Sequence, residues 1–266
     1  MSLVNIPVAR GKPQTLAQKV ASLFRNGEQG VWYDPSDFST MFQDAAGTIP
    51  VTAVGQAVGR ILDKSGRGNH ATQTTSTKRP VLQQDANGKY YLLFDGIDDA
   101  LQTANINFTG TDKVTIWAGV RKLSDVASGA LIELSIDAAT NRAFNIFAPS
   151  RLLGDFSYRL RSTGSLSSDL TITGIPAPVT NLVTAIGDIS NDILRLRING
   201  IQVAENTVDQ GTGNYGNHPL YIGSRGGTSI PFNGRLYSLI VRGAQSTATQ
   251  ISNAETYVNS KTGAYV

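Results

Sequence analysis

The sequence has 266 residues, 16% of them charged, a formal net charge of +3 and no cysteine. The lack of cysteine excludes disulfides, thiol catalysis and thiolate metal sites. The basic residues are scattered and no run approaches the ~18 apolar residues of a membrane span, so neither nucleic acid nor membrane is an expected partner.

Residues 1–30 predict an extended arm followed by a short helix. Pro7 and Pro13 bound the arm, and Thr15 is placed to cap the helix. The apolar residues at helical spacing are Leu16, Val20, Leu23 and Phe24. This stripe needs a partner surface, which is either the chain's own domain or another subunit; disorder is the third reading. The segment lacks the basic and apolar regions of a signal peptide, so none is expected.

From Val31 onward, strand signals dominate. Low charge content with abundant Gly, Thr and Ser is typical of many short strands joined by tight turns. The runs expected as strands are residues 116–120, 130–136, 144–147, 156–160, 220–222 and 235–241.

The clearest single unit is a β-hairpin over residues 192–203. Apolar Leu194, Leu196 and Ile198 alternate with arginines, which predicts one buried and one solvated strand face. Asn199-Gly200 follows at once and favours a type I′ turn, because both central residues of that turn need positive φ.

A second helix is expected near the end of the sequence. Ser246 or Thr247 caps it, and it ends near Gly263. No internal repeat or long linker divides the remaining chain. We therefore expect an all-β, two-sheet antiparallel sandwich over residues 31–266, with the arm and short helix of residues 1–30 before it and a C-terminal helix.

Three ordered stretches resemble the concanavalin A-like, laminin-G-like jelly-roll modules. They are D-x-S-G-x-G-N-H at residues 63–70, F-D-G-x-D-D at residues 94–99 leading into the Trp117 strand, and L-Y-I-G with F-x-G at residues 220–223 and 232–234. The Asn199-Gly200 turn falls where these modules carry an N-G turn. The resemblance covers roughly residues 30–262 and implies a jelly-roll sandwich.

A further block, residues 31–37 with 41–48, resembles a segment of tailed-bacteriophage virion proteins that carry this module. That resemblance implies a tail, fibre or head-decoration component. The expected partners are other virion proteins and further copies of the chain, bound through residues 1–30. The expected location is the virion, assembled in the host cytoplasm.

The aspartates of the first two motifs have two readings. Asp63, Asp95 and Asp98 can bond backbone amides within turns, which is a structural role. The alternative is a calcium site, because clustered carboxylates suit a hard cation and some members of the superfamily bind calcium. The structural reading is favoured, so no cofactor is expected and calcium stays the alternative.

The jelly-roll superfamily includes glycoside hydrolases, but no catalytic constellation is evident. A retaining glycosidase of this kind spaces Glu-x-Asp-x-Glu along one strand. The only glutamates are isolated, at Glu28, Glu133, Glu205 and Glu255. With just two histidines, His70 and His218, a zinc site or catalytic triad is also not expected. The chain is predicted not to be an enzyme.

Sugar binding commonly combines an aromatic platform with polar groups. Asn214, Tyr215 and Asn217 offer that chemistry in one loop, and Arg225 is expected one strand away. The alternative is that these are ordinary hairpin loops. The favoured function is a non-enzymatic phage virion structural or adhesion protein with a lectin-like jelly roll. A carbohydrate-binding module for host surface glycan is the alternative, and a glycan hydrolase is least favoured.

Overall fold

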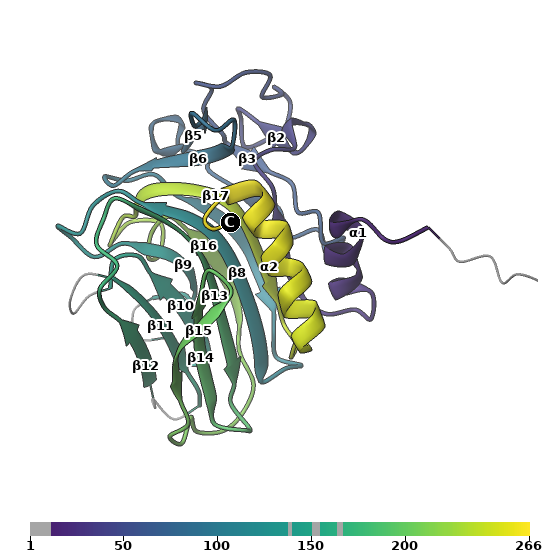
Figure 1. Ribbon diagram of the computed structural model, residues 1–266. Coiled ribbons are helices and arrows are strands. Elements are labelled where there is room, and N and C mark those ends of the chain that lie inside the picture. The colour runs from purple at the N-terminus through teal and green to yellow at the C-terminus, as the bar shows by residue number, and fades with distance from the viewer. Residues whose placement is uncertain (1–11, 138–139, 151–154, 164–166) are drawn as a thin grey trace, which may run out of the picture.

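The computed structural model describes residues 12–137, 140–150, 155–163 and 167–266 (Figure 1). In this part of the chain, the strands form an eight-stranded and a nine-stranded antiparallel sheet. The two sheets pack face to face as the expected jelly-roll sandwich, so the predicted fold class is confirmed.

The eight-stranded sheet carries the predicted hairpin at one edge. Its strands in spatial order are β15 (Ile201–Asn206), β14 (Ile193–Ile198), β13 (Val179–Asp188), β8 (Lys113–Lys122), β17 (Asn233–Arg242), β6 (Tyr90–Asp95) and β5 (Val81–Gln84), with β1 (Gly30–Tyr33) also pairing with β17. Asn199 and Gly200 have φ of 52° and 80°, as the predicted type I′ turn requires. Leu194, Leu196 and Ile198 are buried, so the predicted facing of this strand is confirmed.

The nine-stranded sheet contains four of the predicted strands, at residues 130–136, 144–147, 156–160 and 220–222, whereas those at 116–120 and 235–241 are in the eight-stranded sheet. Its spatial order is β12 (Ser167–Ile172), β11 (Phe156–Arg161), β10 (Ala143–Phe147), β9 (Ala130–Leu134), β16 (Asn217–Ile222), β7 (Leu101–Asn107), β4 (Ala71–Thr72), β3 (Arg60–Ile61) and β2 (Met41–Phe42). Short 3₁₀ turns, η2 (Phe38–Thr40) and η3 (Ser76–Lys78), lie in two connections between the sheets.

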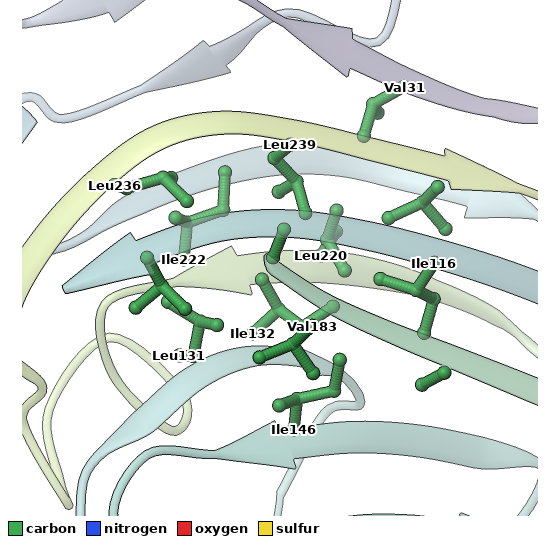
Figure 2. Packing of buried hydrophobic residues seen from close by; sticks show 14 of the residues in the cluster. Val31, Ile116, Leu131, Ile132, Ile146, Val183, Leu220, Ile222, Leu236 and Leu239 are labelled. Atoms are coloured by element: carbon green, nitrogen blue, oxygen red, sulfur yellow. The ribbon is translucent and has the colours of Figure 1, made fainter. Parts of the chain in front are cut away.

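The main core fills the space between the sheets. Figure 2 shows Ile116, Val183 and Leu239 from the eight-stranded sheet facing the same cluster as Ile146 and Leu220 from the other. Each of these side chains is fully buried. Apolar burial of this extent is the main stabilising contribution to such a sandwich.

The outer face of the eight-stranded sheet is covered by helices (Figure 1). Helix α2 (Ala248–Thr262) begins after the N-cap Thr247 and ends at Gly263, whose φ is 63°. It covers a second apolar cluster that includes Trp32, Trp117 and Leu182. Strand β13 was not predicted because Asn181, Thr184 and Gly187 interrupt the apolar run that marks the other doubly buried strands, although the fold buries these three residues as well.

The short N-terminal helix packs on the chain's own sandwich. Helix α1 (Leu16–Ala21) continues into η1 (Ser22–Phe24), and Thr15 forms the predicted cap with Gln18. Val20, Leu23 and Phe24 of this segment are buried in the same cluster as the apolar side of α2. Of the readings left open for the apolar stripe, the structure therefore supports packing within the chain. The arm over residues 1–11 lies outside the described residues.

Candidate functional site

A row of mostly polar side chains crosses the outer face of the nine-stranded sheet. Directly opposed residues in an antiparallel sheet share a face, and here the opposed pairs join end to end across all nine strands. The row runs through Phe42, Arg60, Thr72, Gln102, Tyr221, Glu133, Asn145, Arg159 and Asp169. The flanking residues on these strands, such as Leu134, Leu220 and Tyr158, point instead into the core between the sheets.

The centre of the row is a buried ion pair. Arg225 Nε donates to Glu133 Oε2 at 2.8 Å, and Ser135 Oγ donates to Glu133 Oε1 at 2.7 Å. The Arg225 guanidinium also lies over the ring of Phe147, at 5.2 Å from its centroid. The contacts fix the first turn of the loop that follows β16, because Arg225 leads directly into Gly226 and Gly227. Glu133 is isolated in the sequence because its partner Arg225 lies 92 residues away.

A cavity of about 430 Å³ opens beside this centre. Thr72 and Gln102 of the row form part of its lining, and Gly226, Gly227 and Thr228 line it from the loop. Gly227 lies against the ring of Tyr221, because a Cβ on it would sit 3.6 Å from Tyr221 Cε1. The cavity thus presents hydroxyl and amide groups next to an aromatic edge.

An acidic turn lies next to the cavity. The carboxylates of Asp95, Asp98 and Asp99 come within 4.8 Å of one another, and Lys78, which lines the cavity, pairs with Asp98 at 3.7 Å. Burial raises the pKa of Asp99 to about 6, and the charges of Asp95 and Asp98 act in the same direction. Carboxylates at this spacing suit a calcium ion, which takes oxygen ligands at about 2.3–2.6 Å. Asp99 was not among the predicted metal ligands, although it stands in the same motif.

Asp63 lies outside this cluster. Its Oδ1 accepts hydrogen bonds from Trp32 N and Ser65 N, and its Oδ2 accepts from Ser65 Oγ and Asn69 N. These bonds tie the turn over residues 63–70 to β1. The arrangement agrees with the structural reading of Asp63.

The predicted sugar-binding loop is not a surface platform. Tyr215 is fully buried and packs edge-on against Phe144 at 5.5 Å, so its interpretation as a stacking residue is wrong. The physical reason is that its ring fills core space between the sheets, with its hydroxyl close to Gly187. Burial also raises the pKa of Tyr215 well above its usual value.

The other residues predicted for that site are not brought together. Asn214 Nδ2 donates to Thr109 O at 2.6 Å, and Asn217 begins β16. Arg225 follows the opposite end of that strand, which spans about 20 Å at 3.3 Å per residue. Of the predicted set, only Arg225 contacts the polar row, through its ion pair with Glu133.

Each of the four glutamates forms an ion pair with an arginine. The pairs are Glu28–Arg242, Glu133–Arg225, Glu205–Arg195 and Glu255–Arg197. Glu133 and Asp169 share the outer face but stand three strands apart, or about 14 Å, beyond the ~5–10 Å of a glycosidase carboxyl pair.

The histidines are equally unsuited to a triad. His70 Nδ1 accepts from Asp63 N at 3.0 Å, and burial lowers the pKa of His218.

Comparison with solved structures finds receptor-binding domains of similar fold. The botulinum neurotoxin serotype G binding domain has 13% identity and a TM-score of 0.58, covering 75% of this chain and 49% of that one. The receptor-binding domain of botulinum neurotoxin D has 12% identity and a TM-score of 0.57, with coverages of 74% and 50%. The chain thus spans about half the length of these neurotoxin chains, and the likeness concerns the fold alone.

Sequence comparison identifies the family. No curated protein matches the sequence. The sequence profile of the concanavalin A-like lectin/glucanases superfamily matches residues 94–252. That span includes β7 to β17 and most of the polar row, as well as the acidic turn. The chain therefore belongs to the concanavalin A-like lectin/glucanase superfamily.

Proposed function

We propose that this chain is a non-enzymatic binding module that recognises a host surface glycan on the outer face of its nine-stranded sheet. The observation that carries the proposal is the cavity of about 430 Å³ over Thr72 and Gln102, continuous with the polar row. Glycan hydroxyls need many donors and acceptors, and this face supplies hydroxyls, amides and backbone groups at one place.

The neurotoxin relatives agree with a binding role. The binding domain of botulinum neurotoxin DC is described in complex with SialylT. The cell entry of botulinum neurotoxin type C is described as dependent on interaction with two ganglioside molecules. Those activities belong to the neurotoxins, and at 11–12% identity they give no residue of this chain a role. They support the use of such a sandwich for recognition without catalysis.

The test is glycan-array binding followed by calorimetry with the best glycan. Gln102→Ala removes an exposed amide from the cavity wall, and we expect affinity to fall about tenfold, the effect of one to two hydrogen bonds. Gln202→Ala, on the exposed strand β15 of the other sheet, is the matched control and should bind as the wild type does. Binding that is absent, or that Gln102→Ala leaves intact, contradicts the proposal.

We further propose that the acidic turn holds a calcium ion that orders the cavity wall. Asp95 and Asp99 are the principal ligands, with Asp98 exchanging its contact with Lys78 for the ion. Calorimetry with calcium chloride should show one site, and Asp99→Asn should weaken it at least tenfold. No heat of binding at millimolar calcium would contradict this proposal without affecting the glycan proposal.

The proposed setting of the module is a bacteriophage virion, as a tail, fibre or head-decoration protein. Its support is the sequence of residues 31–37 and 41–48, and the buried contacts of Trp32 and Tyr33 give part of that block a packing role as well. Mass spectrometry of washed phage particles that encode the chain should detect it in stoichiometric amounts. Its absence from such particles would remove the virion assignment.

A further inference from the structure

A second cavity, of about 400 Å³, lies between the N-terminal helical segment and the turn that follows β3. Two arginines line it, Arg25 from the end of η1 and Arg67 from the turn. The rest of the wall is uncharged, with the polar residues Gln14, Gln18, Ser22 and Ser65 and the apolar residues Ala21 and Phe24. Among the described residues, no carboxylate lines this cavity.

Arg67 is held in place yet retains an unused donor. Its guanidinium donates from one terminal nitrogen to Phe24 O at 2.7 Å, and its backbone N donates to Ser65 Oγ at 3.2 Å. The Nε atom of Arg67 is buried and has no hydrogen-bond partner in the described part of the chain. Because Nε is shielded from solvent, a ligand entering the cavity would meet the second terminal nitrogen of Arg67, which also has no hydrogen-bond partner in the described part of the chain.

The acidic groups nearest along the chain are already engaged. Asp63 accepts four hydrogen bonds within its turn, and Glu28 pairs with Arg242 at 2.8 Å. Within the described residues, neither Arg25 nor Arg67 forms an ion pair. The cavity therefore carries two positive charges that the fold itself does not neutralise.

We propose that this cavity binds an oxyanion group, a carboxylate or a phosphate, of a ligand whose remaining part hydrogen-bonds the glutamine and serine side chains. A guanidinium presents parallel N–H donors that match the oxygens of either group. The cavity lies beside α1, on the helix-covered side of the eight-stranded sheet, whereas the proposed glycan face belongs to the other sheet. The two sites therefore have no lining residue in common.

The experiment titrates the whole chain with inorganic phosphate and, separately, with acetate at constant ionic strength, with chloride as the reference salt. The readout is the Nε–Hε NMR signal of Arg67, which should shift saturably with at least one of the two anions. Stronger binding of phosphate would assign the group as a phosphate, and stronger binding of acetate would assign it as a carboxylate. No saturable shift with either anion overturns the proposal.

Variants separate the site from general charge effects. Arg25→Ala removes an exposed side chain that forms no hydrogen bond with the other described residues, and should weaken anion binding about tenfold. Arg67→Lys keeps the positive charge but removes the parallel N–H donors of the guanidinium, and should also weaken anion binding about tenfold. Lys89→Ala, which removes a charge near the end of α2, is the control and should leave binding unchanged. Equal binding by Arg25→Ala and the wild type would overturn the proposal even if Arg67→Lys folds poorly.

Discussion

At the scale of single residues, the Glu133–Arg225 pair dominates the polar row. Both side chains are more than nine-tenths buried, at 2% and 8% exposure. Such a pair need not stabilise the fold relative to apolar residues, but removing one partner leaves an uncompensated buried charge. The pair is therefore a sensitive probe of whether the row is assembled as described.

We expect Glu133→Ala to destabilise the protein by about 3–5 kcal/mol, because Arg225 would stay buried without its carboxylate. Glu205→Ala, which breaks the more exposed pair with Arg195, should cost less than about 1 kcal/mol. Urea unfolding of the two variants gives the comparison. Equal losses of stability would contradict the burial of the Glu133 pair.

Asp99 makes stability depend on pH in a defined direction. Its pKa is raised from 3.8 to about 6, so the folded protein holds a proton that the unfolded chain releases. The stabilising contribution of the protonated group is complete below the unfolded pKa and is lost as pH rises through the folded value.

Asp99→Asn removes this titration while keeping an oxygen that can accept from Asp95 N, as Asp99 Oδ2 does at 3.1 Å. Relative to the wild type, the variant should gain stability between pH 4 and pH 7, by on the order of 1 kcal/mol at pH 7. Urea midpoints measured at each pH provide the test. A difference that is constant across this range would show that Asp99 does not titrate there.

At the scale of elements, the close approach of α2 to β8 depends on Gly119. A Cβ at this position would overlap Thr262 Oγ1 and would lie 3.1 Å from Val258 Cγ1, both on α2. Any other residue type requires either that Thr262, whose Oγ1 donates to Val258 O, changes its rotamer or that α2 moves away from the sheet.

Gly119→Ala should therefore destabilise the protein by about 1–3 kcal/mol, the usual cost of overpacking a well-filled contact. Gly110→Ala is the control, since a Cβ there meets nothing within 4 Å. Thermal unfolding of both variants measures the two losses of stability. A neutral Gly119→Ala would mean that α2 lies further from the sheet.

The elements also show which patterns are predictive. The β14–β15 hairpin was predicted because alternation and the Asn199-Gly200 turn are both encoded within a dozen residues. The capping of α2 by Thr247 is equally local. Strand β13 lacks such a local signal, because Asn181, Thr184 and Gly187 interrupt its apolar residues although all three are buried.

At the scale of the whole molecule, the N-terminal helical segment is part of the folded body. Val20, Leu23 and Phe24 pack with Trp32 and α2 in one cluster. The apolar stripe of this segment thus packs within the chain, and assembly of several copies through residues 1–30 stays a prediction.

Deletion of residues 1–25 should destabilise the sandwich by about 4.5–9 kcal/mol, from the loss of three buried apolar side chains. Urea unfolding measures the loss, and native mass measurement of the same samples reports the oligomer. Unchanged stability would contradict the packing of α1 and η1. An unchanged oligomer would exclude assembly through this segment.

The sequence by itself determined the class of fold, the helix caps, the hairpin and the turns of the family motifs, because each depends on residues close together in the chain. Only the tertiary structure decided that Tyr215 is buried in the core and that Arg225 forms an ion pair with Glu133. It also decided that the Asp99 carboxylate lies within 4.8 Å of those of Asp95 and Asp98, beside the cavity. The polar row is the clearest case, because its members come from nine strands whose spatial order differs from their order in the sequence. Register across such a sheet is set by non-local pairing and by burial of the opposite face, and no local pattern contains it.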